Sequence, residues 1–138
     1  MAQQFFDNTS RQEEVYSDID LAFLSHPVTG KLTRKINRQA VRQSVKNLIL
    51  TDHYERPFKP EIGCTIRGLL FENSYPGLDE DLARTIQETI ENHEPRVQLI
   101  QVQIDEKPDQ HAIAISIVFR IINVTEPETL DLLLERVR

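Results

Sequence analysis

The chain has 138 residues, of which 28% are charged and 39% are apolar, and its formal net charge is -6. That length suits one domain, which buries about two-thirds of its unfolded surface. The acidic balance argues against a protein that coats nucleic acid or an anionic membrane. No apolar run approaches the roughly 18 residues of a membrane helix, and the first twenty residues lack a secretory pattern. We therefore expect a protein made and kept in a cytoplasm.

Cysteine, histidine and glycine are all sparse. Cys64 is the single cysteine, so the chain offers neither an internal disulfide nor the cysteine spacing of a zinc site. The four histidines are scattered singly, and the four glycines form no phosphate-binding loop. We therefore expect no metal and no cofactor.

The chain begins with a polar stretch. We expect residues 1–15 to form a flexible N-terminal arm and residues 16–138 to form one domain. Residues 18–37 predict a short strand, a turn around Pro27 to Gly30, and a second short strand.

Three helices are predicted next. Over 37–51, Val41, Val45, Leu48 and Ile49 recur at helical spacing and so share one face. Pro57 then makes the following stretch non-helical. A short helix over about 64–72 can bury its two leucines, Leu69 and Leu70.

The best-marked helix covers 79–93. Its first turn is acidic, which suits the positive end of the helix dipole. Leu78, Leu82, Ile86 and Ile90 form its apolar stripe, and Pro95 ends it.

From residue 97 the apolar period becomes that of a strand. The alternation over 97–104 changes phase between Leu99 and Ile100, which predicts a β-bulge. A turn over 105–110 and a strand over 112–122 follow. Residues 129–137 favour a terminal strand, although Leu133 breaks the alternation and leaves a helix open. The predicted fold is α+β, a small, mainly antiparallel sheet with helices 37–51 and 79–93 packed on one face. The N-terminal hairpin is a candidate addition to that sheet.

Two polar features are candidate sites. A basic face recurs every fourth residue at Arg34, Arg38, Arg42 and Lys46. It is a solvated helix surface or a docking face for an acidic protein, and nucleic acid is the least favoured partner because no aromatic residues are interleaved for stacking.

The second feature is Glu94-Pro95-Arg96, at the junction of the long helix and the first core strand. Because Pro95 fixes the backbone, Glu94 and Arg96 form either a local ion pair or a two-headed polar anchor for another chain. Glu72, Asp79, Glu94 and Asp105 are candidate glycosidase carboxylates, but their spacing selects no pair.

Four blocks in order carry a family resemblance. They are Tyr16-Ser17-Asp18-Ile19-Asp20, then Arg56-Pro57-Phe58 with Pro60-Glu61 and Gly63-Cys64, then Leu70-Phe71-Glu72-Asn73, then Glu94-Pro95-Arg96. Over residues 16–122 the chain resembles the baseplate wedge subunits of contractile-tailed bacteriophages, a family that includes a type VI secretion baseplate component. The Tyr16–Asp20 block favours a phage over a bacteriocin or a secretion machine.

The resemblance implies a non-enzymatic structural subunit of a virion tail baseplate. Glu94, Pro95 and Arg96 would dock onto a helical bundle of other wedge proteins. The sheet would exchange strands with the tail sheath protein and so initiate sheath assembly; the residues assigned to it are Ile113, Ile115, Ile117, Phe119, Leu130, Leu132 and Leu134. Tail tube and hub proteins are further candidate partners. The alternatives are a lysozyme-like, peptidoglycan-degrading enzyme of the tail and a regulatory module that uses the basic face.

Overall fold

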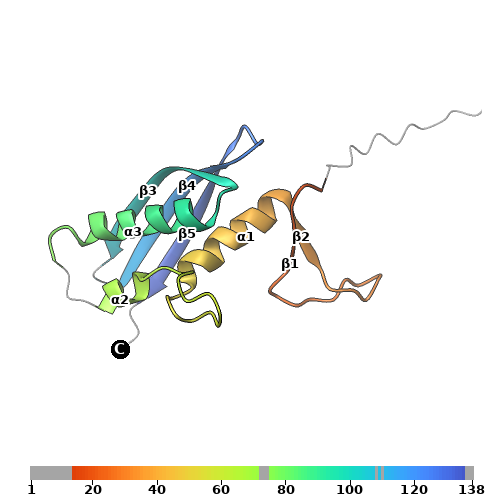
Figure 1. Cartoon of the computed structure of the whole chain (residues 1–138), viewed down its shortest axis with the longest axis horizontal. Helices are drawn as coiled ribbons and strands as arrows, with labels where there is room; N and C mark the ends of the chain where they lie inside the picture. The colour runs from red at the N-terminus through yellow and green to blue at the C-terminus, as the bar shows by residue number, and fades with distance from the viewer. Residues whose placement is uncertain (1–13, 72–74, 108, 110, 136–138) are drawn as a thin grey trace, which may run out of the picture. The chain divides into compact units, whose positions relative to one another are not determined.

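The computed structural model describes residues 14–71, 75–107, 109 and 111–135 (Figure 1). The chain divides into two compact units, residues 1–40 and residues 41–138. The predicted arm over 1–15 lies almost wholly outside the described residues. Within the described ranges, no helix has the length and apolar character needed to cross a bilayer.

The first unit contains the predicted hairpin. Strand β1 (Ser17–Ile19) pairs antiparallel with β2 (Arg34–Ile36), and a bridge between Ser25 and Leu32 continues the pairing toward the turn. Gly30 closes that turn by donating its N–H to the carbonyl of His26 at 2.9 Å. The hairpin forms its own two-stranded sheet and does not extend the larger one.

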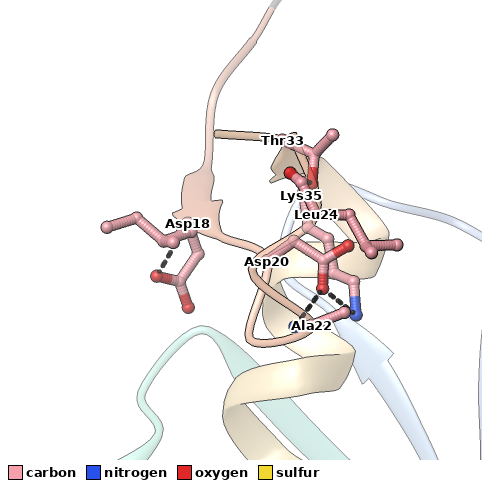
Figure 2. A network of polar contacts seen from close by, with 7 residues as sticks. Asp18, Asp20, Ala22, Leu24, Thr33 and Lys35 are labelled. Atoms are coloured by element: carbon pink, nitrogen blue, oxygen red, sulfur yellow. Dashed lines mark hydrogen bonds and ion pairs between the residues drawn. The ribbon is translucent and has the colours of Figure 1, made fainter. Parts of the chain in front are cut away.

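Polar bonds fix the middle of the hairpin (Figure 2). One carboxylate oxygen of Asp20 accepts the N–H of Ala22 at 3.1 Å and lies 3.3 Å from the ammonium of Lys35. The bond from Ala22 is the main cause that lowers the pKa of Asp20, and Lys35 adds to it. Thr33 donates its hydroxyl to the carbonyl of Leu24 at 3.1 Å, which ties the two arms together.

Helix α1 spans Asn37–Leu50, as predicted. Its apolar face is buried at Val41, Val45, Leu48 and Ile49, which confirms the periodicity argument. Arg34 lies in β2 and so precedes the helix. The prediction that Arg34 shares a helical face with the later basic residues is therefore wrong, because helical spacing has no meaning before the helix begins.

Two further helices follow. Helix α2 is a short segment, Ile66–Phe71, and its N-terminal Ile66 is buried. Helix α3 spans Leu78–His93, with Gly77 in a left-handed conformation just before it. Its predicted apolar stripe is fully buried, and its acidic first turn places three carboxylates at the positive end of the helix dipole.

A three-stranded antiparallel sheet completes the second unit. Its strands are β3 (Val97–Lys107), β4 (Ala112–Ile121) and β5 (Pro127–Glu135), in the order β3-β4-β5. The register of β3 shifts between Leu99 and Gln101, which confirms the predicted bulge. Residues 105–107, predicted as turn, continue β3. Residues 127–135 form a strand, so the helical alternative for this segment is wrong.

The core lies between α3 and the inner face of this sheet. Alternate residues of β4, from Ile113 to Ile121, point into it and are almost completely buried. Helix α3 packs across this face (Figure 1), contacting β3 in particular. Phe119 is the largest of the fully buried side chains, so the centre of the core lies under the middle strand.

Candidate functional site

A tight corner joins α3 to β3. Glu94 ends the helix with φ −128° and ψ 76°, outside the helical region that a following proline disfavours. Its N–H still donates to the carbonyl of Ile90 at 2.9 Å, and its carbonyl accepts the N–H of Val97 at 3.1 Å. The carbonyl of Arg96 accepts the N–H of Ile122 at 2.9 Å, just after β4. The corner is therefore held by the main chain on both sides of Pro95.

Glu94 is a buried carboxylate, only 3% exposed. Arg96 donates to both of its oxygens, from Nε at 2.6 Å and from Nη2 at 2.7 Å. The hydroxyl of Ser44, on α1, donates to Oε2 at 2.6 Å. Glutamate is almost never fully buried unless it is paired, and here the fork of the guanidinium and one hydroxyl meet that need.

The protonation of Glu94 follows from this arrangement. Burial acts to raise the pKa of Glu94, since it disfavours the charged form. The hydrogen bonds from Arg96 and Ser44 act in the opposite direction and outweigh burial. The pKa of Glu94 consequently lies below its usual value, and the carboxylate is ionised at neutral pH.

The two charged residues of the predicted two-headed anchor differ in exposure: Glu94 is buried, and Arg96 is partly exposed. The carboxylate of Glu94 points inward and is engaged by its own chain, as expected for the local ion pair. The side chain of Arg96 is 36% exposed, so part of it reaches the surface. Glu94 thus orients Arg96 from beneath, and Arg96 is the charged head that another chain could meet.

Ser44 is a member of this site that sequence reasoning missed, although a signal for it exists. It lies three residues after Val41 and four before Leu48, which places a hydroxyl within the apolar stripe of α1. A lone polar residue in a buried stripe needs a hydrogen-bond partner. Its partner, Glu94, is 50 residues away, and that pairing could not be read from the sequence.

The residues assigned to strand exchange fall into two groups. Ile113, Ile115, Ile117 and Phe119 lie on β4, whose backbone pairs with β3 on one side and β5 on the other. A strand paired on both sides has no edge to offer, so these residues serve the core instead.

The remaining three residues, Leu130, Leu132 and Leu134, lie on β5. Within the described residues β5 pairs only with β4, so its other side is an edge of the sheet. Strand β3 is the opposite edge, and it is interrupted where Ile100 bulges out of the ladder and stands 55% exposed.

Only three of the four residues of the predicted basic face lie on helix α1. Arg38, Arg42 and Lys46 are exposed at four-residue spacing on α1. Arg34, on β2, lies 3.8 Å from a carboxylate oxygen of Glu14, with both side chains more than half exposed.

Neither metal binding nor carboxylate catalysis finds a site in the described residues. No group of three or more His, Cys, Asp or Glu side chains there is placed to hold a metal ion. Of the candidate carboxylates for glycoside hydrolysis, Glu72 lies outside the described residues, and Asp79 and Asp105 are exposed. Glu94 has a lowered pKa, the reverse of what a general acid needs.

Two comparisons with known proteins give the same family. The family model described as baseplate wedge protein gp25 matches residues 36–125. The baseplate wedge protein gp25 of Enterobacteria phage T4 is 29% identical over 110 residues, which cover 80% of this chain and 83% of that protein.

Solved structures share the fold at lower identity. A candidate tail lysozyme from Geobacter sulfurreducens superposes with a TM-score of 0.70 at 17% identity, over 78% of this chain and 98% of that one. A chain of the anti-feeding prophage baseplate has a TM-score of 0.62 at 22% identity, over 88% of this chain and 87% of that one. A chain of the postcontracted pyocin R2 baseplate has a TM-score of 0.55 at 16% identity, over 88% of this chain and 100% of that one. Since the family model spans well over half of the sequence, the chain belongs to the baseplate wedge protein gp25 family, whose members are structural components of contractile tails.

Proposed function

We propose that this baseplate wedge protein initiates the tail sheath. In this proposal the outer edge of β5 pairs with a strand from a sheath subunit, while the corner at Glu94–Arg96 attaches the protein to other wedge proteins. The observation that carries the proposal is the regular outer edge of β5, which belongs to a sheet whose other two strands are fully paired or bulged.

The choice of β5 over β3 rests on the shape of the two edges. All nine residues of β5 pair in unbroken register with β4, so the N–H and C=O groups on its far side are evenly spaced. Such an edge is a template for an added strand. On β3 the bulge at Ile100 kinks the strand, and bulges are one of the devices that protect an edge from pairing.

The corner supplies the attachment. Main-chain bonds and the buried carboxylate of Glu94 hold Arg96 in one orientation, so little conformational entropy is lost when a partner binds it. A guanidinium suits carboxylates or clustered carbonyl oxygens, which the ends of helices in a bundle provide.

A lysozyme-like activity lacks comparable support. General-acid catalysis needs a carboxyl group with a raised pKa in a protected pocket. The surface of the second unit is hollowed along α3 and β3 and again near the end of β4. The first hollow is lined by a single carboxylate, Glu80, and the second by none, so neither offers the pair that hydrolysis requires.

A proline scan tests the assignment of the edge. Proline removes an N–H, so it disrupts the fold where that group pairs with β4 and is tolerated where it faces outward. We expect the tolerated positions among Thr129–Leu133 to give folded protein and complete baseplates without an extended sheath, as seen by electron microscopy of tails. Proline at Val102 or Ile104 of β3, where the N–H faces away from β4, is the matched control. Normal sheaths from every folded β5 variant would contradict the proposal.

Arg96→Lys tests the corner separately. Lysine keeps the positive charge beside Glu94 but cannot form the planar fork, so the variant should fold and yet enter baseplates poorly. Normal incorporation of Arg96→Lys would remove the corner from the proposal without affecting the role of β5.

A further inference from the structure

The loop between α1 and α2 carries two exposed aromatic side chains. Phe58 is 100% exposed and Tyr54 is 84% exposed. The loop is coloured yellow-green in Figure 1. Exposed aromatic rings lose the free energy that burial would provide, about 25 cal/mol for each Å² of apolar surface. Two of them in one loop therefore suggest a use outside the folded chain.

The backbone at both aromatic residues is unusual. Phe58 and Tyr54 each have φ 68°, in the left-handed region that bulky side chains rarely occupy. Lys59 donates its N–H to the carbonyl of Arg56 at 3.4 Å, which makes Phe58 the third residue of a turn with Pro57 at its second position. Proline followed by a positive φ is the pattern of a type II turn, whose third position favours glycine or asparagine. Phenylalanine is thus a costly residue at this place.

Tyr54 repeats the arrangement. Glu55 donates its N–H to the carbonyl of Asp52 at 3.2 Å, so Tyr54 is the third residue of a second turn. Two turns in one loop therefore each place an aromatic residue where glycine would be less strained. Backbone strain of this kind clusters at binding and catalytic sites.

The loop is also rigidly closed. Tyr54 donates its N–H to the carbonyl of Pro60 at 3.0 Å, and Cys64 donates to that of Thr51 at 2.7 Å, which joins the two ends of the loop. Gly63 lies so close to this crossing that a Cβ on it would come within 2.7 Å of the backbone of Asp52. The aromatic side chains are therefore held out by an ordered scaffold.

We propose that this loop, residues 52–63, is a docking element that inserts Phe58 into an apolar pocket of another tail protein, with Tyr54 packing beside it. Two cations, Arg56 and Lys59, are the charged residues nearest to the phenylalanine in sequence. Of the carboxylates in the loop, Glu55 accepts the N–H of Asp52 at 2.9 Å, Asp52 lies 3.5 Å from Arg67, and the exposed Glu61 is farther along the loop. The pocket on the partner should accordingly have carboxylates at its rim. Rigid aromatic anchors beside arginine are typical of the residues that dominate binding free energies.

Phe58→Asn separates binding from folding. Asparagine tolerates the left-handed conformation, and the exposed ring makes no packing contribution to lose, so the melting temperature should stay equal or rise. Incorporation of the variant into purified tails should nevertheless fall at least about tenfold, the loss expected for an anchor residue. Val28→Asn, which removes a similarly exposed apolar side chain from another turn, should have little effect on incorporation.

Photo-crosslinking identifies the occupant. A benzoylphenylalanine at position 58, irradiated in assembled tails, should join this chain to one other tail protein, at a peptide with apolar and acidic residues. A crosslink to a second copy of this chain would overturn the proposal. So would the absence of any crosslink, or tails assembled normally with Phe58→Asn.

Discussion

The guanidinium of Arg96 holds the buried carboxylate of Glu94 through two hydrogen bonds, of 2.6 Å from Nε and 2.7 Å from Nη2. The two residues are separated only by Pro95, so the pair is local in sequence. Its third member, Ser44, comes from α1 and binds the same carboxylate at 2.6 Å. This cluster joins α1, the end of α3 and the start of β3 through one side chain.

Glu94→Gln should lower the free energy of unfolding by about 2 kcal/mol, because hydrogen bonds to a charged group are stronger than those to an amide. Chemical denaturation of the purified protein measures the effect. Glu88→Gln, a change to an exposed carboxylate six residues earlier on α3, is the control and should stay within about 0.5 kcal/mol of the wild type. Equal effects of the two changes would mean that the buried pair contributes little.

The stabilisation by Glu94 should depend on pH in the acidic range. The folded protein lowers the pKa of Glu94, so the contribution is complete above the unfolded value of about 4.5 and is lost as pH falls through the lower folded value. The difference in unfolding free energy between the wild type and Glu94→Gln should therefore be constant at neutral pH and shrink below about pH 4.5. A difference that persists or grows in acid would contradict the assigned direction.

Phe119→Ala should lower the free energy of unfolding by about 3–5 kcal/mol, since it leaves a cavity beneath the central strand. Leu133→Ala on β5, where the side chain is half exposed, should cost far less. Thermal or chemical unfolding of both variants provides the comparison. A small effect at Phe119 would contradict the placement of the β4 residues in the core.

The thiol of Cys64 should not react in the folded protein. It is fully buried, and burial is the main cause that raises the pKa of Cys64, so little thiolate forms and reagents cannot reach it. A colorimetric thiol assay at about pH 8 should detect no thiol until denaturant is added. A cysteine introduced by Thr65→Cys, one residue along and exposed, should give one reactive thiol under native conditions. Rapid reaction of the wild type would show that the segment opens easily.

Much of the fold is readable from local patterns. The stripes of α1 and α3, the phase change at Leu99–Ile100 and the alternation of β4 all report contacts that repeat every two to four residues. What the sequence could not provide is the order of the strands. Alternation identifies the buried face of β4, but only long-range pairing shows that β4 is central and that Ile113–Phe119 have no open edge.

The candidate site is predictable in part for the same reason. Glu94-Pro95-Arg96 is readable because the three residues are consecutive, and the local ion pair is one of the two interpretations that the sequence allows. The inward direction of Glu94 depends on Ser44, which is distant in sequence. The left-handed conformations of Tyr54 and Phe58 escape prediction because no glycine or asparagine marks either turn.

The bulge at Ile100 makes the two edges of the sheet different: the β5 edge is regular, and the β3 edge is interrupted. A subunit whose sheet had two regular edges could pair edge to edge with copies of itself and form an unlimited polymer. Under the proposed function, a strand from a sheath subunit would add only at the β5 edge, because the bulge at Ile100 interrupts the β3 edge. The one extra residue of this bulge would then restrict the protein to one-sided strand addition and prevent unlimited edge-to-edge assembly of its own copies.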